Sequence, residues 1–216
     1  MLKIRLSHSM AMKPFVFAGA LILLVVLNTS LSLAWEGSFD METPLQYTIH
    51  VTRQGDTLCD IAASPEVYGS CLKWPQLYYY NIDELRDTVA HDMDFPFTPL
   101  PPGLSMAIIH PSNVKNRSEK ILREYKNFWT INVMSRDQSR DLTELAIQIM
   151  DQGYYCYITK FVTEDTVWKR LRVGFFPSLE ITREKQLELG EKLGLSDAWI
   201  NKATPEEVLE FIGFLE

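Results

Sequence analysis

Strand alternation in the C-terminal half of the chain gathers side chains that can bind a carbohydrate. Residues 128–134, 154–162 and 167–175 are predicted strands, and successive side chains of a strand point to opposite faces of its sheet. The apolar side chains define one face. The other face then carries aromatic rings, an amide and two guanidinium groups, which come from Asn132, Tyr155, Tyr157, Trp168, Arg170 and Arg172.

This mixture favours a sugar ligand. Aromatic rings stack on the C–H faces of sugar rings, while amide and guanidinium groups bind hydroxyls. Aromatic groups on a solvated sheet face are costly unless they bind something. The alternative is cross-strand aromatic pairing, which would only stabilise the sheet. The pattern alone does not decide between these two interpretations.

The elements that position this face follow the order strand, helix, strand, strand, helix, strand. Ser139 and Gly153 bound the first predicted helix, and the second ends at Gly194. A short last strand covers residues 198–202. The order predicts an α+β fold, βαββαβ, in which a four-stranded antiparallel sheet has both helices on one face.

A final helix is predicted for residues 204–216. Thr204, Pro205 and Glu207 are typical of a helix start, with a cap, a proline at the first helical position and a glutamate at the third. We expect the apolar face of this helix to dock on a domain of the chain or, alternatively, to meet a partner protein.

The N-terminal half is organised around residues 47–62, which are predicted to form a strand, a tight turn and the first turns of a helix. Gly55 permits the sharp change of direction. Thr57 is a good N-cap, and Asp60 three residues later can close a capping box. A longer helix is expected at about residues 72–86.

Two further segments are predicted to lack regular structure for most of their length. Residues 87–100 contain Pro96 and Pro99 and are expected to form a loop. Residues 112–126 are polar and charged, and we interpret them as a linker with about two helical turns.

The N-terminal stretch resembles the opening of a lysin motif (LysM) domain, whose most recognisable feature is the Gly-Asp-Thr-Leu run at residues 55–58. The resemblance continues through residues 64–81 and 100–108. It implies a βααβ domain over residues 47–111 that binds N-acetylglucosamine-containing chains in a shallow groove between two loops. The residues implied in binding are Gly55, Asp56, Thr57, Asn81, Pro102 and Gly103.

A structural role for the same residues stays open, because any such fold needs this turn and cap. The segment 87–100 is longer than the usual link of the family. It can therefore either block the groove or extend it.

Residues 127–203 resemble the SPOR domain, the sporulation-related repeat that binds peptidoglycan stripped of its stem peptides. The resemblance lies in Trp-Thr-Ile-Asn-Val-Met-Ser at 129–135 and Trp-Lys-Arg-Leu-Arg-Val-Gly-Phe at 168–175. The family usually has Gln at the position of Asn132 and an aromatic residue at that of Arg136. The resemblance implies glycan binding, above all by Asn132, Ser135, Trp168 and Arg170, and a septal or division-associated role.

The N-terminus has the pattern of an export signal. The apolar run 15–27 follows a basic start and precedes the small-x-small site Ser32-Leu33-Ala34. We expect residues 1–34 to be a cleaved signal peptide. The alternative is an uncleaved membrane anchor over residues 15–34. A polar leader, residues 35–46, follows.

Charge excludes two classes of partner. The formal net charge is -7. The first 34 residues hold three basic residues and no acidic one, which leaves 18 basic against 28 acidic residues in the body. An acidic body without a basic run argues against nucleic acid and against an anionic membrane surface.

Two of the three cysteines, Cys59 and Cys71, lie within the LysM-like segment. In an oxidising compartment they can pair, and a loop of this size would add roughly 3 kcal/mol of stability. The alternative is two buried thiols. Cys156 lies in an apolar strand and is expected in the core.

The chain lacks metal-ligand spacings, cysteine–histidine pairings and nucleophile motifs. We therefore predict a non-catalytic bacterial envelope protein without cofactor or metal, which binds peptidoglycan glycan strands through both modules. One alternative is an adaptor between envelope or division proteins, with a LysM-like domain that binds no sugar. The second is a peptidoglycan-remodelling enzyme.

Overall fold

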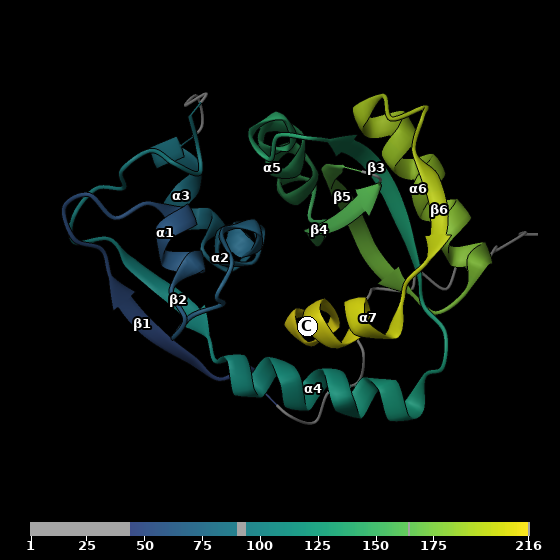
Figure 1. The fold of residues 1–216 in the computed structure, drawn as a ribbon, viewed down its shortest axis with the longest axis horizontal. Helices are drawn as coiled ribbons and strands as arrows, with labels where there is room; N and C mark the ends of the chain where they lie inside the picture. The colour runs from purple at the N-terminus through teal and green to yellow at the C-terminus, as the bar shows by residue number, and fades with distance from the viewer. Residues whose placement is uncertain (1–43, 90–93, 164, 216) are drawn as a thin grey trace, which may run out of the picture. The chain divides into compact units, whose positions relative to one another are not determined.

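The computed structural model describes residues 44–89, 94–163 and 165–215 (Figure 1). The predicted signal peptide or anchor, residues 1–34, and all but the end of the predicted leader lie outside these residues. No helix of the described part is long and apolar enough to cross a membrane.

The N-terminal half is a two-stranded sheet with helices between its strands. β1 (Tyr47–Val51) pairs antiparallel with β2 (Ser105–Ile109). Thr57 caps the first helix as predicted, because its hydroxyl accepts a hydrogen bond from the Asp60 amide at 3.0 Å. The elements between the strands are α1 (Leu58–Ala63), the 3-10 turn η1 (Cys71–Lys73), α2 (Trp74–Tyr80) and α3 (Ile82–Val89).

The helix predicted as one piece over residues 72–86 is interrupted. Asn81 leaves the helical conformation, with φ -130 and ψ 27. Its buried side chain bonds to the carbonyl oxygens of Leu77 and Ala107 and accepts from the Ala107 amide. The side chain thus ties the end of α2 to β2, and the helix direction changes at that point.

The segment interpreted as a linker is a helix of about four turns, α4 (Pro111–Glu124). Its buried side chains include Val114 and Ile121. These pack with the C-terminal residues Phe211 and Phe214 in one apolar cluster. The linker interpretation was therefore wrong, because this segment has an apolar face that is covered by the end of the chain.

The second half has the predicted βαββαβ order and an antiparallel sheet. Its strands lie in the order β4-β5-β3-β6, so the first and third strands are central. The elements are β3 (Trp129–Arg136), the 3-10 turn η2 (Arg140–Leu142), α5 (Thr143–Asp151), β4 (Cys156–Thr163), β5 (Thr166–Phe176), α6 (Leu179–Leu193) and β6 (Trp199–Lys202).

One face of this sheet is covered by α5 and α6, as predicted. Ile131, Leu171, Val173, Cys156 and Ile158 lie in the same buried cluster as the apolar residues of the two helices. The helix ends follow the expected chemistry. Ser178 caps α6 at its start, and Gly194 ends it in the left-handed conformation at φ 68, which favours glycine.

The opposite face is covered as well, by the end of the chain. α7 (Pro205–Phe211) and the turn η3 (Ile212–Phe214) follow β6. They pack against Tyr155, Tyr157 and Phe175 on one side and against α4 on the other. Figure 1 shows α7 between the sheet and α4. The final helix thus docks on its own chain.

The two halves share one core. Trp74, Leu77 and Tyr78 of α2 belong to the same buried cluster as the residues under α5. The Gln76 amide, which is fully buried, donates to the Tyr155 hydroxyl and the Cys156 carbonyl, each at 3.2 Å. The described residues of the two halves thus belong to a single compact unit.

Candidate functional site

The structure confirms the predicted allocation of side chains to the two sheet faces but not the openness of the second face. Tyr155, Tyr157, Arg172 and Asn132 lie on the face away from α5 and α6. All four are buried, with exposures of 6% or less. The expectation of a solvated face was wrong for these residues. The end of the chain packs on Tyr155 and Tyr157, Glu207 of α7 pairs with Arg172, and Asn132 is fully buried.

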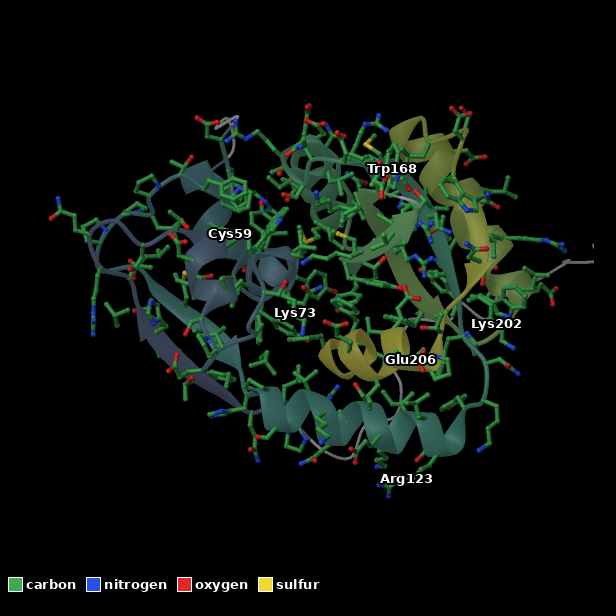
Figure 2. All side chains as sticks on the ribbon, in the orientation of Figure 1. Cys59, Lys73, Arg123, Trp168, Lys202 and Glu206 are labelled. Atoms are coloured by element: carbon green, nitrogen blue, oxygen red, sulfur yellow. A yellow bond between two sulfur atoms is a disulfide. The ribbon has the colours of Figure 1, made fainter. Side chains whose placement is uncertain are left out.

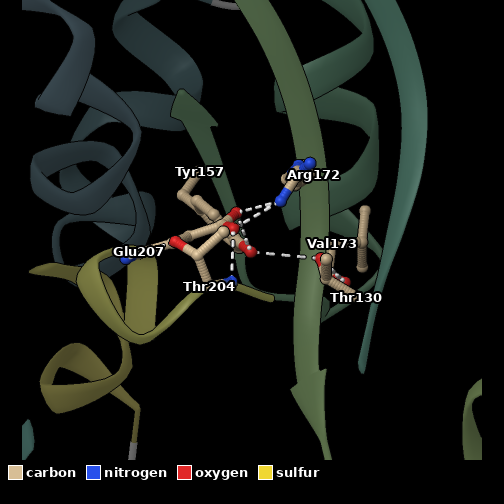
Figure 3. Close-up of polar contacts among 6 residues, drawn as sticks. All are labelled: Thr130, Tyr157, Arg172, Val173, Thr204 and Glu207. Carbon is tan, nitrogen blue, oxygen red and sulfur yellow. Dashed lines mark hydrogen bonds and ion pairs between the residues drawn. The ribbon is translucent and has the colours of Figure 1, made fainter. Parts of the chain in front are cut away.

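A polar network holds α7 on the sheet (Figure 3). Arg172 forms an ion pair with Glu207, and both side chains are 7% exposed. The Tyr157 hydroxyl lies 2.8 Å from the Glu207 carboxylate and 3.1 Å from the Thr130 hydroxyl. Glu207 thereby combines two roles, since it also completes the capping box with Thr204.

Buried tyrosines on this face cannot ionise near neutral pH. Burial raises the pKa of the Tyr157 hydroxyl well above its ordinary value, and the negative charge of Glu207 raises it further. Burial likewise raises the pKa of Tyr155, whose hydroxyl donates to the Phe211 carbonyl at 3.0 Å. These two residues act as structural contacts to the C-terminal helix, in a position where they cannot touch a glycan.

Beyond α7, the same face carries a partly exposed aromatic shelf. Phe161 and Trp168 are cross-strand partners whose rings stack at 6.3 Å with 17° between their planes. The Arg170 guanidinium lies over the Phe161 ring, 3.9 Å from its centre. Because all three side chains are half-buried, they keep part of their surface in contact with solvent.

Two cross-strand pairs beside the shelf hold buried polar atoms without hydrogen-bond partners among the described residues. Asn132 faces Arg172, and Ser135 faces Arg170. The unpartnered atoms are both amide atoms of Asn132, the hydroxyl of Ser135 and the Nε of each arginine. Buried polar groups normally find hydrogen-bond partners, so these five atoms are exceptions among the described residues.

Trp199 completes the face on its other edge. It is the cross-strand partner of Asn132 on β6 and is 42% exposed. The row Trp199, Asn132, Arg172 thus crosses three strands. The sequence interpretation missed Trp199 and Phe161. Alternation along residues 154–162 places Phe161 with Tyr157, and the same alternation applied to the strand 198–202 would have found Trp199.

A cleft of about 440 Å³ opens beside this surface. Its walls come from η1, β4, β5 and α7, so both halves of the chain contribute. Lys73 lies on η1 and Glu206 on α7 (Figure 2). The charged residues that line the cleft are Lys73, Lys160, Arg170, Arg172, Glu206, Glu207 and Glu210.

Two ion pairs neutralise part of this lining. Lys73 binds Glu210 at 3.0 Å, and Arg172 binds Glu207. Arg170 has no carboxylate partner among the described residues. Burial lowers the pKa of Arg170, and the nearby Arg172 guanidinium lowers it further. The cleft therefore presents a cation whose charge no neighbouring acid of the described part neutralises.

The residues implied by the LysM resemblance are used within the fold. Asn81 is buried, and its amide bonds three backbone groups. Asp56 accepts from the Arg53 amide at 2.8 Å, and this bond holds the pKa of the Asp56 carboxyl below its ordinary value. Thr57 caps α1. Pro102 and Gly103 are exposed in the turn that precedes β2.

The end of the long insert docks on the loop that follows β1. The Cys59 amide donates to the Pro96 carbonyl at 3.1 Å, and the Leu100 amide donates to the Asp56 carbonyl at 2.7 Å. Thr57 and Pro99 form an isolated bridge. Phe95 is fully buried against Trp74. Residues 95–100 thus use two backbone groups of the segment 56–59 in hydrogen bonds within the fold.

Cys59 and Cys71 form a disulfide with their Cα atoms 4.5 Å apart, while Cys156 is a free, buried thiol. The bond joins α1 to η1, one wall of the cleft. Burial raises the pKa of the Cys156 thiol, which makes that residue inert. No cluster of three potential metal ligands occurs among the described residues.

Comparisons of the chain with models of protein families, with curated proteins and with solved structures found no match.

Proposed function

We propose that this chain is a non-catalytic, exported protein of the bacterial envelope that binds peptidoglycan glycan strands. Its N-terminal half is LysM-like and its C-terminal half SPOR-like, with a septal or division-associated role by the same resemblance. The disulfide is compatible with an oxidising compartment, although it supports export only weakly.

The observation that carries this proposal is the sheet surface beyond α7. It combines aromatic rings that are partly exposed with buried polar atoms that lack partners: Phe161, Trp168 and Trp199 beside Asn132, Ser135 and Arg170. Aromatic rings and hydrogen-bonding groups side by side are what a sugar chain requires. The binding surface is therefore smaller than the sequence predicts, since Tyr155 and Tyr157 are removed from it.

A sacculus pull-down tests the proposal. Purified sacculi, with and without amidase treatment, are mixed with the protein, and the bound fraction is measured. We expect binding to rise after amidase treatment and to fall roughly fivefold in Trp168→Ala, because an aromatic contact is worth on the order of 1 kcal/mol. Trp168→Phe should retain most of the binding. Tyr47→Ala serves as the control, since Tyr47 is exposed on β1, outside the surface.

A second candidate is an envelope adaptor whose LysM-like half binds no sugar. It is favoured by the insert, which occupies the loop after β1. Against it stands the intramolecular docking of the C-terminal helix, whose apolar residues Phe211, Ile212 and Phe214 are buried in the chain itself. An adaptor would stay in the supernatant of the pull-down. A remodelling enzyme would clear sacculi embedded in a gel.

A further inference from the structure

The two arginines of β5 share a single carboxylate. Arg172 and Arg170 are two residues apart on one strand and therefore point to the same face. Glu207 pairs with Arg172, and no other carboxylate of the described residues pairs with either guanidinium. The two guanidinium groups and the Glu207 carboxylate consequently carry a net charge of +1. All three line the cleft, where Arg172 is almost fully buried. A neighbouring anion would neutralise it.

Arg170 is the member of this pair that such an anion can reach. Its side chain is half-buried and lines the cleft, whereas Arg172 is 6% exposed and the Nε of each arginine is buried. The Arg170 guanidinium lies 3.9 Å from the centre of the Phe161 ring, and this contact restricts its movement. Guanidinium groups bind carboxylates strongly because the donor spacing matches the two carboxylate oxygens.

We propose that Arg170 binds a carboxylate of the ligand, namely the lactyl carboxylate of an N-acetylmuramic acid residue. This inference rests on the proposed function. While a stem peptide is attached, that carboxyl carbon is part of a neutral amide. Removal of the peptide by hydrolysis leaves a free carboxylate at the same place. Charge at this single atom then distinguishes a stripped glycan from an intact one.

The aromatic shelf and the cleft together determine how the bound sugar would be oriented. The sugar ring would lie on Trp168 and Phe161, and its acidic substituent would reach into the cleft past Arg170. Glu206 on α7 also lines the cleft, and its negative charge would repel a second carboxylate, whereas Glu210 is paired with Lys73. A stem peptide, which carries several carboxylates and a bulky amide link, fits this charge pattern less well.

Competition experiments with the full-length protein test the inference. Amidase-treated sacculi with bound protein are titrated with N-acetylmuramic acid, with its lactyl methyl amide, with N-acetylglucosamine and with the free stem tripeptide. We expect N-acetylmuramic acid to displace the protein at a concentration at least about tenfold lower than the other three probes. Raising the salt concentration should reduce the difference in displacing concentration between N-acetylmuramic acid and the other probes.

Matched variants assign the difference to Arg170. Arg170→Gln should lose the preference for N-acetylmuramic acid over its amide, and Arg170→Lys should keep only part of it because it lacks the planar fork. Arg183→Gln, an exposed arginine on α6, should behave as wild type. Circular dichroism of each variant would establish that the fold is retained.

The outcomes separate this inference from the proposed function. If the wild-type protein does not bind sacculi, both fail. If it binds but N-acetylmuramic acid and its amide compete equally, the carboxylate contact is wrong and the glycan surface stands. Stronger competition by the stem tripeptide would assign the cleft to peptide and overturn the inference.

Discussion

Arg172 on β5 and Glu207 on α7 form an ion pair in which each side chain is only 7% exposed to solvent. The pair joins the C-terminal helix to the sheet face that the sequence predicts to be open. Removing only one partner of such an ion pair lowers stability strongly, because the remaining charge stays buried without a partner. The position of α7 is therefore a stable feature of the fold, and the glycan surface is what α7 leaves uncovered.

Glu207→Gln should destabilise the protein by about 3–5 kcal/mol, since it leaves the buried charge of Arg172 without a carboxylate partner. The free energy of unfolding in urea measures the effect. Glu206→Gln is the matched control on the same helix, because Glu206 is exposed, and it should change stability by less than about 0.5 kcal/mol. Equal urea midpoints for the two variants would contradict the assignment of the buried pair.

The disulfide should be detectable in two ways, by the number of free thiols and by its effect on the free energy of unfolding. Unfolded, unreduced protein should contain one titratable thiol, that of Cys156, and three thiols would show that Cys59 and Cys71 are not joined. Reduction should lower the free energy of unfolding by about 3 kcal/mol, because it releases the unfolded chain from the constraint of a closed loop of this size. A Cys59→Ala, Cys71→Ala double variant should be insensitive to reductant.

Glu188 contributes to the free energy of unfolding by an amount that depends on pH below about pH 4.5. Hydrogen bonds from Lys192 at 2.8 Å and Lys185 at 2.9 Å hold the pKa of Glu188 at about 2, below its ordinary value of 4.5. A carboxyl group with a lowered pKa stabilises the folded state above about pH 4.5 and loses this contribution as the pH falls toward 2. Because the side chain is 34% exposed, solvent limits the contribution to at most about 1 kcal/mol.

Glu188→Gln should therefore be less stable than wild type at pH 7, and the difference should shrink between pH 4.5 and 2. Urea unfolding at a series of pH values measures it. Lys192→Met removes the strongest donor and should reproduce part of the same dependence. A difference that stays constant from pH 7 to 2 would rule out Glu188 as its source.

The sequence predicts those elements whose determinants are local. The capping residues Thr57 and Thr204 begin helices as expected, and alternation assigns the faces of β4 and β5 correctly. These features depend on a few neighbouring residues and on the period of the backbone. Ser139 precedes η2 rather than α5 and makes no capping hydrogen bond through its side chain.

Two features depend on contacts between residues far apart in the chain, and the sequence does not reveal them. The apolar face of α7 is visible in the sequence, but its partner is set by packing against Tyr157 and α4. The prolines of the insert, residues 87–100, can be recognised in the sequence. The burial of Phe95 beside Trp74, however, depends on how the whole N-terminal half packs. Among the predicted site residues, Trp168 and Arg170 are partly exposed, whereas Tyr155 and Tyr157 are buried.

The end of the chain supplies a last prediction, because Gly213 lies where no side chain fits. A Cβ atom at Gly213 would lie 2.0 Å from the Val114 carbonyl oxygen on α4. The glycine amide donates to the Ser118 hydroxyl at 2.9 Å, and its carbonyl accepts from Arg117 Nε at 3.0 Å. Gly213→Ala must therefore move η3 away from α4, which weakens these bonds and the apolar contacts of Phe214 beside them.

We expect Gly213→Ala to lower the free energy of unfolding by about 1–3 kcal/mol, the usual cost of overpacking. Gly190→Ala is the matched control. Gly190 lies inside α6, and the nearest atom to its added Cβ is 3.8 Å away, so the same substitution there should stabilise the helix by about 0.5–1 kcal/mol. Opposite signs for the two changes in urea unfolding would establish that the close approach of η3 to α4 exists in solution. If Gly213→Ala also raised tyrosine accessibility to solvent, the loosened end would be shown to cover Tyr155 and Tyr157.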